Sequence, residues 1–341
     1  MKRLIFTLLL MACCSAIAIN AQRQLTDSVR IDGTMRAYHM YIPEGTPDGA
    51  PLVFVVNGYG NPCKPTASWM NAAADAHKFA VCIPVALLDP TGHPGWNVGY
   101  PAQQGWEVDD MDALCKLART VQKRYHLSRE NTFLTGMSNG GDMCYLMAYR
   151  GQETFKAFAS LAGLTMVWIY NWYDAPAPVP LLEIHGTEDR VSEWDGDLDN
   201  KGGWGEYMPV DLATGYMVAK NRCRKIDIDT VPSMKGGSPI IQYRYSNPES
   251  HNDVWLYKVI GAPHCHFTDY MNTGEEVWKF FSRYIKQRLL LQEFAQISYR
   301  WHRLIHLHLL SQAILYGIYR TCRAVGYQRN FFTCQVQHQS H

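Results

Sequence analysis

Short, nearly continuous apolar runs alternate with segments of helical periodicity between residues 51 and 285. Such runs are typical of strands that are buried on both faces of a sheet. They lie at residues 51–56, 79–86, 131–135, 157–162, 179–185 and 254–260. The alternation predicts an α/β fold whose central sheet is mostly parallel and carries helices on both faces.

Helical periodicity is clearest in the run DDMDALCKLARTVQKRYH, where apolar side chains recur every three or four positions. The segments that we expect to be helical lie at residues 109–126, 142–150, the second half of 187–231, and 275–285. Before the first apolar run, residues 29–43 alternate around a glycine, as a β-hairpin does. With 47% hydrophobic residues, the chain can fill the core of one large domain.

The first 21 residues begin with Lys2 and Arg3, continue as an apolar stretch, and end in small residues up to Ala21. This layout is typical of a secretory signal peptide and predicts a secreted or periplasmic protein whose main domain covers residues 22–285. The alternative is a lipid anchor through Cys13. No other apolar segment reaches the about 20 residues of a spanning helix, so we expect no membrane span.

Residues 286–341 differ in composition from the rest of the chain. They hold seven Lys and Arg, one Glu and five of the thirteen histidines. A basic amphipathic helix on a membrane surface and a histidine-rich metal site are two interpretations of this composition. Because the apolar residues share no clean face, we expect instead a poorly structured or non-native tail that function does not require.

Composition also bears on partners and on disulfides. The first 285 residues carry 25 basic and 30 acidic residues, and this mild acidity argues against nucleic-acid binding. Export permits disulfides among the six cysteines of the main domain, and Cys63, Cys223 and Cys265 are the better candidates. The other three lie in apolar or helical runs, as buried free thiols do. No cysteine or histidine spacing indicates zinc, and we expect neither a metal nor a cofactor.

The stretch from Gly136 to Gly140, GMSNG, matches the pattern G-x-S-x-G between a predicted strand and a predicted helix. In such a nucleophile elbow, glycines permit a strained turn that exposes the serine. The amino terminus of the following helix directs backbone amides at the oxyanion that forms during attack. We therefore predict that Ser138 is a nucleophile.

A serine nucleophile needs a histidine base and an acid that orients the base. Asp189 follows the strand-like run 179–185, at the edge of the sheet where such folds build their sites, and is the predicted acid. The alternatives for this role are Glu188, Glu193 and Asp195. His185 precedes the acid, and we expect it to hold the acid loop in place.

The predicted base is His264, which follows the run 254–260. His266 competes for this role, but it lies two residues further along a chain that leaves the sheet. The second oxyanion donor is expected in the loop after the first apolar run. There Gly58 permits a sharp turn, so the backbone amide of Tyr59 can join that of Asn139.

Seven motifs in a fixed order resemble those of secreted esterases known as polyhydroxybutyrate depolymerase-like or feruloyl esterase-like. The motifs are R-x-Y (36–38), PLVFVVNGYG (51–60), GWN (95–97), VDDMDAL (108–114), TGMSNGG (135–141), HGTED (185–189) and GAPH (261–264). The resemblance covers residues 29–285 and implies the α/β-hydrolase fold with Ser138, Asp189 and His264 as the triad. The sequence departs from the family at Asn57, where histidine is usual, and after His264, where Trp-Pro is frequent.

The resemblance implies a serine esterase that acts on plant cell-wall polysaccharide or oligosaccharide. Feruloyl esters are the leading substrate, because a single-domain exported enzyme suits soluble oligosaccharides better than a solid polyester. Acetylxylan and polyhydroxyalkanoate are the alternatives. A peptidase of the prolyl oligopeptidase type would share the triad, but no repeated propeller blades are visible. A non-catalytic carbohydrate-binding protein on the same scaffold is the rival from another class, and loss of a triad member would favour it.

Two further features lie in the segment 187–231. Its acidic residues from Asp195 to Glu206 resemble a calcium loop, although Asn200 stands where such loops have glycine, so we favour a solvated loop. Trp194 and Trp204, with Trp96 from an earlier loop, are predicted to line a cleft for a sugar or phenolic ring. Further aromatic candidates for this cleft are Trp69, Tyr100 and Tyr207. Packing in the core is the alternative for all six aromatic residues.

Overall fold

The computed structural model of the chain describes residues 23–63, 68–173 and 177–286. The predicted signal peptide, the candidate anchor Cys13 and nearly all of the predicted tail lie outside the described residues. The main domain is built around one ten-stranded sheet with the order β1-β2-β4-β3-β7-β8-β9-β12-β11-β10. Among the described residues, no helix is both long and apolar enough to cross a membrane.

The centre of the sheet is parallel, as the continuous apolar runs predict. It consists of β4 (Ala80–Pro84), β3 (Leu52–Val56), β7 (Thr132–Met137), β8 (Phe158–Leu161), β9 (Leu181–Gly186) and β12 (Val254–Val259). Antiparallel strands extend both sides: β1 (Arg23–Ile31) and β2 (Thr34–Ile42) at one end, and β11 (Ile240–Ser246) and β10 (Lys225–Val231) at the other. A short hairpin, β5 (Leu87–Leu88) and β6 (Pro94–Gly95), forms a separate two-stranded sheet.

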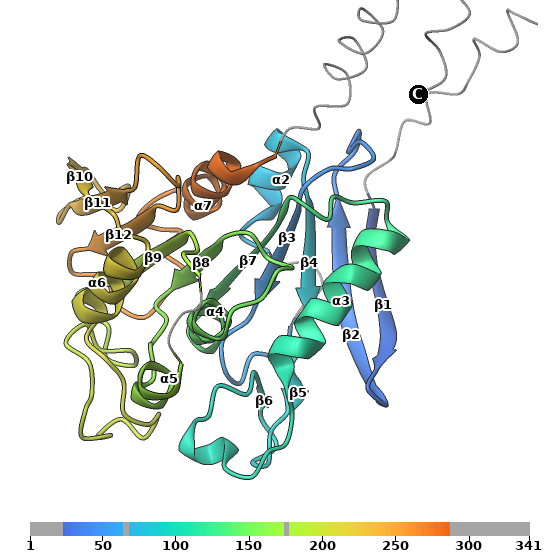
Figure 1. The fold of residues 1–341 in the computed structure, drawn as a ribbon, viewed down its shortest axis with the longest axis horizontal. Coiled ribbons are helices and arrows are strands. Elements are labelled where there is room, and N and C mark those ends of the chain that lie inside the picture. The colour runs from blue at the N-terminus through green and yellow to red at the C-terminus, as the bar shows by residue number, and fades with distance from the viewer. Residues whose placement is uncertain (1–22, 64–67, 174–176, 287–341) are drawn as a thin grey trace, which may run out of the picture. The chain divides into compact units, whose positions relative to one another are not determined.

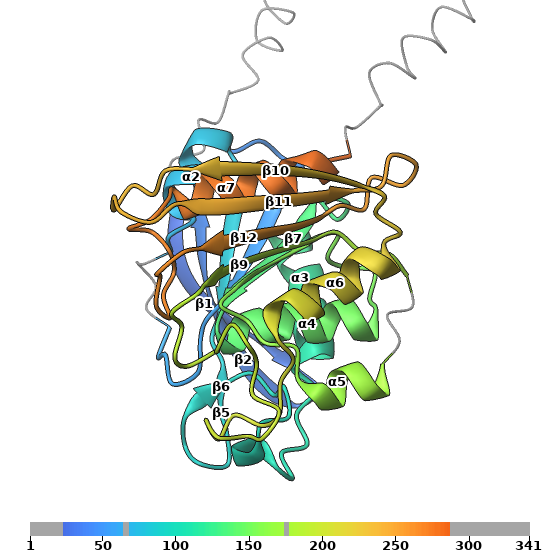
Figure 2. The same ribbon diagram turned by 90° about the vertical axis from the view of Figure 1, so that its left-hand side faces the viewer.

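Helices cover both faces of the sheet (Figures 1 and 2). One face packs against α3 (Asp110–Arg124), α4 (Asn139–Arg150), α5 (Val167–Trp172) and α6 (Val210–Lys220), and the other against α2 (Asn71–His77) and α7 (Thr273–Phe281). Strand β3 shows why both faces are apolar. Leu52 and Phe54 belong to the core on the α4 side, whereas Val53 and Val55 belong to the core on the α7 side. The predicted fold class is confirmed.

The two ends of the sheet differ from its centre in burial. Every residue of β3, β7 and β9 is buried, whereas six of the seven residues of β10 are exposed and the seventh is half-buried. All six cysteines of the described residues are free thiols, so the expected bridge among Cys63, Cys223 and Cys265 does not form there. The main core is therefore held by packing between the sheet and its helices.

Candidate active site

Ser138 stands between the last residue of β7 and the first residue of α4. Its backbone has φ 58° and ψ −125°, a conformation that costs a non-glycine residue on the order of 1–3 kcal/mol. Strand β7 and helix α4 are otherwise buried along almost their whole length, while Ser138 itself is half-buried. The turn therefore presents the serine hydroxyl outside the packed core, as the G-x-S-x-G pattern predicts.

Glycine is required on both sides of this serine because backbone passes close by. A Cβ on Gly140 would lie 2.3 Å from the carbonyl oxygen of Val56, and one on Gly136 would lie 2.5 Å from that of Gly140. Ordinary contacts of a Cβ begin near 3.4 Å. The first turn of α4 can therefore pack against the end of β3 only without these side chains.

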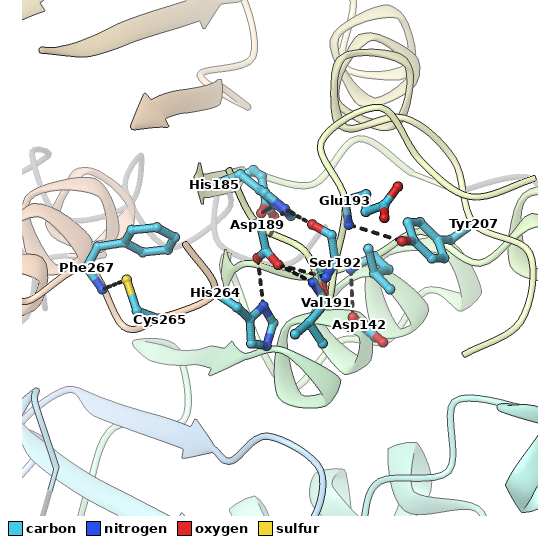
Figure 3. A network of polar contacts seen from close by, with 12 residues as sticks. Asp142, His185, Asp189, Val191, Ser192, Glu193, Tyr207, His264, Cys265 and Phe267 are labelled. Carbon is cyan, nitrogen blue, oxygen red and sulfur yellow. Dashed lines mark hydrogen bonds and ion pairs between the residues drawn. The ribbon is translucent and has the colours of Figure 1, made fainter. Parts of the chain in front are cut away.

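Asp189 and His264 are joined by a hydrogen bond (Figure 3). The Nδ1 atom of His264 lies 2.6 Å from Oδ2 of Asp189. The other carboxylate oxygen, Oδ1, accepts hydrogen bonds of 2.8 Å from the backbone amides of Val191 and Ser192. The Asp189 side chain is fully buried, and the His264 side chain is 17% exposed. A buried carboxylate with both oxygens hydrogen-bonded thus orients the His264 imidazole through Nδ1.

His266, the competing base, occupies a different place. Its ring lies beside that of Trp69, with 6.4 Å between the ring centroids. Burial, with a smaller contribution from His264, lowers the pKa of His266. The carboxylate of Asp189 bonds to His264, which favours His264 as the base.

Sheet topology brings Ser138, Asp189 and His264 to one edge. They follow β7, β9 and β12, which run parallel in the sheet with only β8 between β7 and β9. Their side chains therefore come from the carboxyl ends of neighbouring strands. In addition, Ser138 shares a cavity of about 10 Å³ with Val191 and Ser192, the two residues whose amides bond to Asp189.

The predicted oxyanion residues are held together by Trp96. The side chain of Asn139 accepts a 2.7 Å hydrogen bond from the Trp96 amide and donates a 3.0 Å bond to the Trp96 carbonyl. The indole Nε1 of Trp96 donates a 3.0 Å bond to the carbonyl of Asn57, at the start of the oxyanion loop. In the same loop, a Cβ on Gly58 would lie 3.2 Å from Cβ of Ser138. Trp96 therefore links the nucleophile elbow to the oxyanion loop.

A buried ion pair, Arg36–Asp110, fixes the backbone next to Trp96. Nη1 of Arg36 donates a 2.6 Å bond to Oδ1 of Asp110, and Oδ2 of Asp110 accepts a 2.8 Å bond from the amide of Asn97. Burial raises the pKa of Asp110, and Arg36 opposes this effect. Three of the motifs seen in the sequence, those containing Arg36, Asn97 and Asp110, thus form one structural support.

Tyr59 is fixed through its side chain. Its hydroxyl donates a 2.5 Å bond to Oδ2 of Asp89, which lies in the β5–β6 turn. Burial and this bond raise the pKa of Tyr59. The ring also packs edge-on against Trp204, with 5.6 Å between centroids. These contacts limit where the Tyr59 backbone amide can lie.

The three tryptophans predicted to line a cleft lie in different surroundings. Trp96 is 1% exposed and Trp194 is 8% exposed. Trp194 packs under Nζ of Lys258 and donates to Asp211, so it acts as a packing residue, and the cleft prediction is not supported for Trp96 or Trp194. Trp204 is half-buried and lines the small cavity next to Ser138. Burial of an aromatic residue depends on tertiary packing, which the sequence pattern does not reveal.

A larger cleft of about 860 Å³ lies between the oxyanion loop and the base loop. Its lining includes Asn57 and Tyr59, which flank Gly58, together with Trp69, His266 and Thr268. A volume in the range of about 300–1,000 Å³ is usual for small-molecule sites. Of the six aromatic residues that the sequence suggested for a cleft, Trp69 is the one that lines this cavity.

The carboxylates of Asp197 and Asp199, in the acidic loop at 195–206, bond to partners within the same loop. The Asp197 carboxylate accepts bonds from the amides of Asp199 and Gly202, and Asp199 pairs with Lys201. Across the described part of the chain, no three or more His, Cys, Asp or Glu side chains converge as metal ligands would. The Asp197 carboxylate thus stabilises its own loop through backbone amides.

Comparisons with known proteins identify relatives of this chain. Residues 83–189 match the model of the prolyl oligopeptidase family. The chain is 25% identical over 172 residues to a bifunctional acetylxylan esterase/xylanase of Neocallimastix patriciarum, covering 50% of this chain and 24% of that protein. It is 29% identical over 231 residues to feruloyl esterase C of Emericella nidulans, covering 64% of this chain and 73% of that protein. The chain spans about half or less of the length of the first curated relatives that it matches.

Among solved structures, the acetyl xylan esterase of Aspergillus awamori superimposes with a TM-score of 0.53 at 14% identity, covering 77% of this chain and all of that one. At this identity the likeness concerns the fold alone. The chain therefore has the α/β-hydrolase fold, and esterases are among the proteins that it resembles.

Proposed function

We propose that this α/β-hydrolase cleaves carboxylic esters through Ser138, His264 and Asp189. The observation that carries the proposal is the 2.6 Å bond between Asp189 and His264 at the edge of the sheet where the strained Ser138 is presented. His264 removes the proton of Ser138 as Oγ attacks the ester carbonyl. The backbone amides of Tyr59 and Asn139 stabilise the oxyanion.

The remaining steps follow from proton balance. Protonated His264 returns its proton to the leaving alcohol as the carbon–oxygen bond breaks, which leaves an acyl group on Ser138. Water then attacks the acyl-enzyme while His264 removes a proton from it, and the free acid departs as Ser138 is restored. Asp189 stays ionised and stabilises the imidazolium in both halves of the reaction.

For the substrate we propose esters on plant cell-wall polysaccharide or oligosaccharide, with feruloyl groups leading and acetyl groups on xylan as the alternative. Support comes from relatives named feruloyl esterase and acetylxylan esterase, and from the 860 Å³ cleft beside the oxyanion loop. Trp69 and His266 offer ring faces on which a phenolic or sugar ring can stack. Polyhydroxyalkanoate rests on the sequence resemblance alone.

A peptidase of the prolyl oligopeptidase type is the second candidate, because residues 83–189 match that family's model. The matched segment ends at Asp189, so it contains the elbow and the acid, which esterases and peptidases of this fold share. Only substrate turnover separates the two candidates.

The test is turnover of four substrates: methyl ferulate, p-nitrophenyl acetate, a polyhydroxybutyrate suspension and a prolyl p-nitroanilide. We expect the ferulate ester and the acetate to be cleaved by the wild type, and Ser138→Ala to lose both activities. Equal rates for wild type and Ser138→Ala would refute the ester hydrolase, and cleavage of the anilide alone would establish the peptidase. His264→Ala is expected to be far less active than His266→Ala.

The cleft has its own test. Replacing Trp69 with alanine should raise KM for methyl ferulate and leave KM for p-nitrophenyl acetate nearly unchanged, because only the larger substrate reaches the ring. Trp172→Ala is the matched control, since Trp172 is 79% exposed on α5 and lines none of the cavities described above. An equal change for both esters would place the ferulate ring elsewhere.

A further inference from the structure

Behind the Asp189 carboxylate lies a second acid and a second imidazole, Glu183 and His185. Both are fully buried, and both belong to β9 two residues apart, so they face the same side of the sheet as Leu181 and helix α4. Nδ1 of His185 lies 2.9 Å from Oε1 of Glu183. Figure 3 shows His185 and His264 on opposite sides of Asp189. Burying a charged pair costs desolvation free energy that an apolar pair of the same size would not. Its presence in the buried centre of the sheet therefore indicates a specific role.

The hydrogen bonds of His185 determine how many protons the pair holds. Nε2 of His185 lies 2.8 Å from the backbone carbonyl of Ser192, which can only accept, so Nε2 carries a hydrogen. A neutral ring with that hydrogen and an ionised Glu183 would place two lone pairs 2.9 Å apart. One further proton must therefore lie between Nδ1 and Oε1.

We propose that His185 is an imidazolium paired with the Glu183 carboxylate, and that it acts as a positioning residue for Asp189. Nε2 of His185 lies 3.7 Å from Oδ2 of Asp189, the oxygen that accepts the bond from His264. The same Nε2 holds the carbonyl of Ser192, whose amide bonds to the other oxygen of Asp189. The pair thus places a positive charge behind the acid and fixes the loop that orients it. This inference rests on the proposed esterase mechanism.

Other titratable groups surround the pair. Asp142, Cys144 and Tyr145 approach it from α4, and Tyr207 lies toward Asp189 from the acid loop. Burial raises the pKa of Cys144 and Tyr145 well above their usual values, so both stay neutral at physiological pH. Burial raises the pKa of Asp142 to about 7, and Glu183 adds to this.

The pKa directions of the pair agree with a retained proton. Burial lowers the pKa of His185, but the bond to Glu183 outweighs it, and the net direction is upward. Burial raises the pKa of Glu183, against the opposing effect of His185. Both partners therefore resist losing the shared proton.

Replacing Glu183 with glutamine tests the charge. The glutamine amide can donate to Nδ1 of a neutral His185, so the shape and the hydrogen bond remain while the positive charge is lost. Asp189 then faces less positive charge, protonation of His264 becomes easier, and the acid limb of kcat/KM moves to higher pH. A unit charge about 4 Å away at an effective dielectric of about 20 shifts a pKa by about three units. The negative charge of Glu183, on the opposite side of the imidazole from Asp189, is lost as well and cancels much of this effect, so we expect a shift on the order of one pH unit.

Asp253→Asn is the matched control. Asp253 is a buried carboxylate that accepts a 2.6 Å bond from Arg283, but it precedes β12 and lies at the opposite end of the strands from Asp189. Both variants should be less stable than the wild type, and only Glu183→Gln should move the acid limb. An active Glu183→Gln enzyme whose acid limb matches that of wild type overturns the proposal, because a purely structural role would leave the limb in place.

A second measurement does not need the variant to fold or the enzyme to be active. In the wild-type protein labelled with ¹⁵N-histidine, His185 should keep the two similar nitrogen shifts of an imidazolium from pH 6 to pH 8. A neutral ring at pH 7, with one protonated and one bare nitrogen, overturns the proposal. Absence of turnover on every ester would instead overturn the proposed function and leave this result standing.

Discussion

Replacing Trp96 with phenylalanine removes the indole N–H group and leaves a smaller aromatic ring in the same buried position. The lost bond is the 3.0 Å contact from Nε1 to the Asn57 carbonyl, which joins the elbow to the oxyanion loop. A hydrogen bond of this kind contributes about 1 kcal/mol net, so its loss alone should lower the melting temperature by about 2–4 °C for a domain of this size. The cavity left by the smaller ring lowers the melting temperature further. The effect on catalysis should be larger than the effect on stability.

Removing an oxyanion donor outright lowers kcat about 10²–10³-fold in other hydrolases. In Trp96→Phe the Tyr59 amide is retained but less well placed, so we expect kcat to fall about tenfold with little change in KM, the signature of an interaction made in the transition state. Steady-state kinetics on p-nitrophenyl acetate, with thermal denaturation in parallel, measure both effects.

Trp168→Phe provides the comparison. Its Nε1 donates a bond of the same length, 3.0 Å, to the carbonyl of Val98, two residues after Trp96, but it does not touch the oxyanion loop. Both variants should lose stability, Trp96→Phe more because Trp96 is fully buried and Trp168 only half-buried, while only Trp96→Phe loses kcat. If kcat is the same in both variants, Trp96 does not position the oxyanion loop and the reasoning is refuted.

Two further predictions concern the elbow and the buried acid beneath it. Gly140→Ala should abolish activity and lower stability, because its Cβ would lie 2.3 Å from the Val56 carbonyl oxygen. Gly215 on α6 has open space around it, so Gly215→Ala should raise the unfolding free energy by about 0.5–1 kcal/mol. Denaturant titration measures both effects, and equal changes in stability for the two variants would contradict this prediction. Burial raises the pKa of Asp142 from 3.8 in the unfolded chain to about 7, so the folded state binds this proton more tightly and gains stability as the pH falls from about 7 towards 4. Asp142→Asn should lack this gain, and a stability difference between variant and wild type that stays constant over this pH range would show that Asp142 does not titrate there.

The parallel centre of the fold could be predicted because burial on both faces leaves a continuous apolar run in the sequence. The six expected strands are all present, with bounds that shift by a few residues. Strands β10 and β11 were not predicted, although IDIDTV and IIQYRY alternate. Their exposed faces carry charged residues, and the run of apolar residues that marked the other strands is missing.

The candidate triad followed from order along the chain, and its catalytic roles stay predictions that the 2.6 Å bond between Asp189 and His264 supports. The buried residues that hold the candidate triad and the oxyanion loop in place were harder to predict. Trp96 looked like a ligand-facing ring but lies in the core, since an aromatic side chain gives the same signal in either place. Glu183 was passed over inside an apolar strand, where a charged residue flanked by Leu182 and Ile184 is itself an indication of a buried partner.

Strand β10 ends the sheet with a free row of backbone donors and acceptors, and its exposed Ile226 and Ile228 invite pairing with another chain. Lys225, Asp227 and Asp229 alternate with them and act as gatekeepers against edge-to-edge aggregation. For protein engineering, the free edge of β10 is where a fused strand can be attached away from the candidate triad, which follows β7, β9 and β12. The same two aspartates are the residues to leave unchanged when the protein is produced at high concentration.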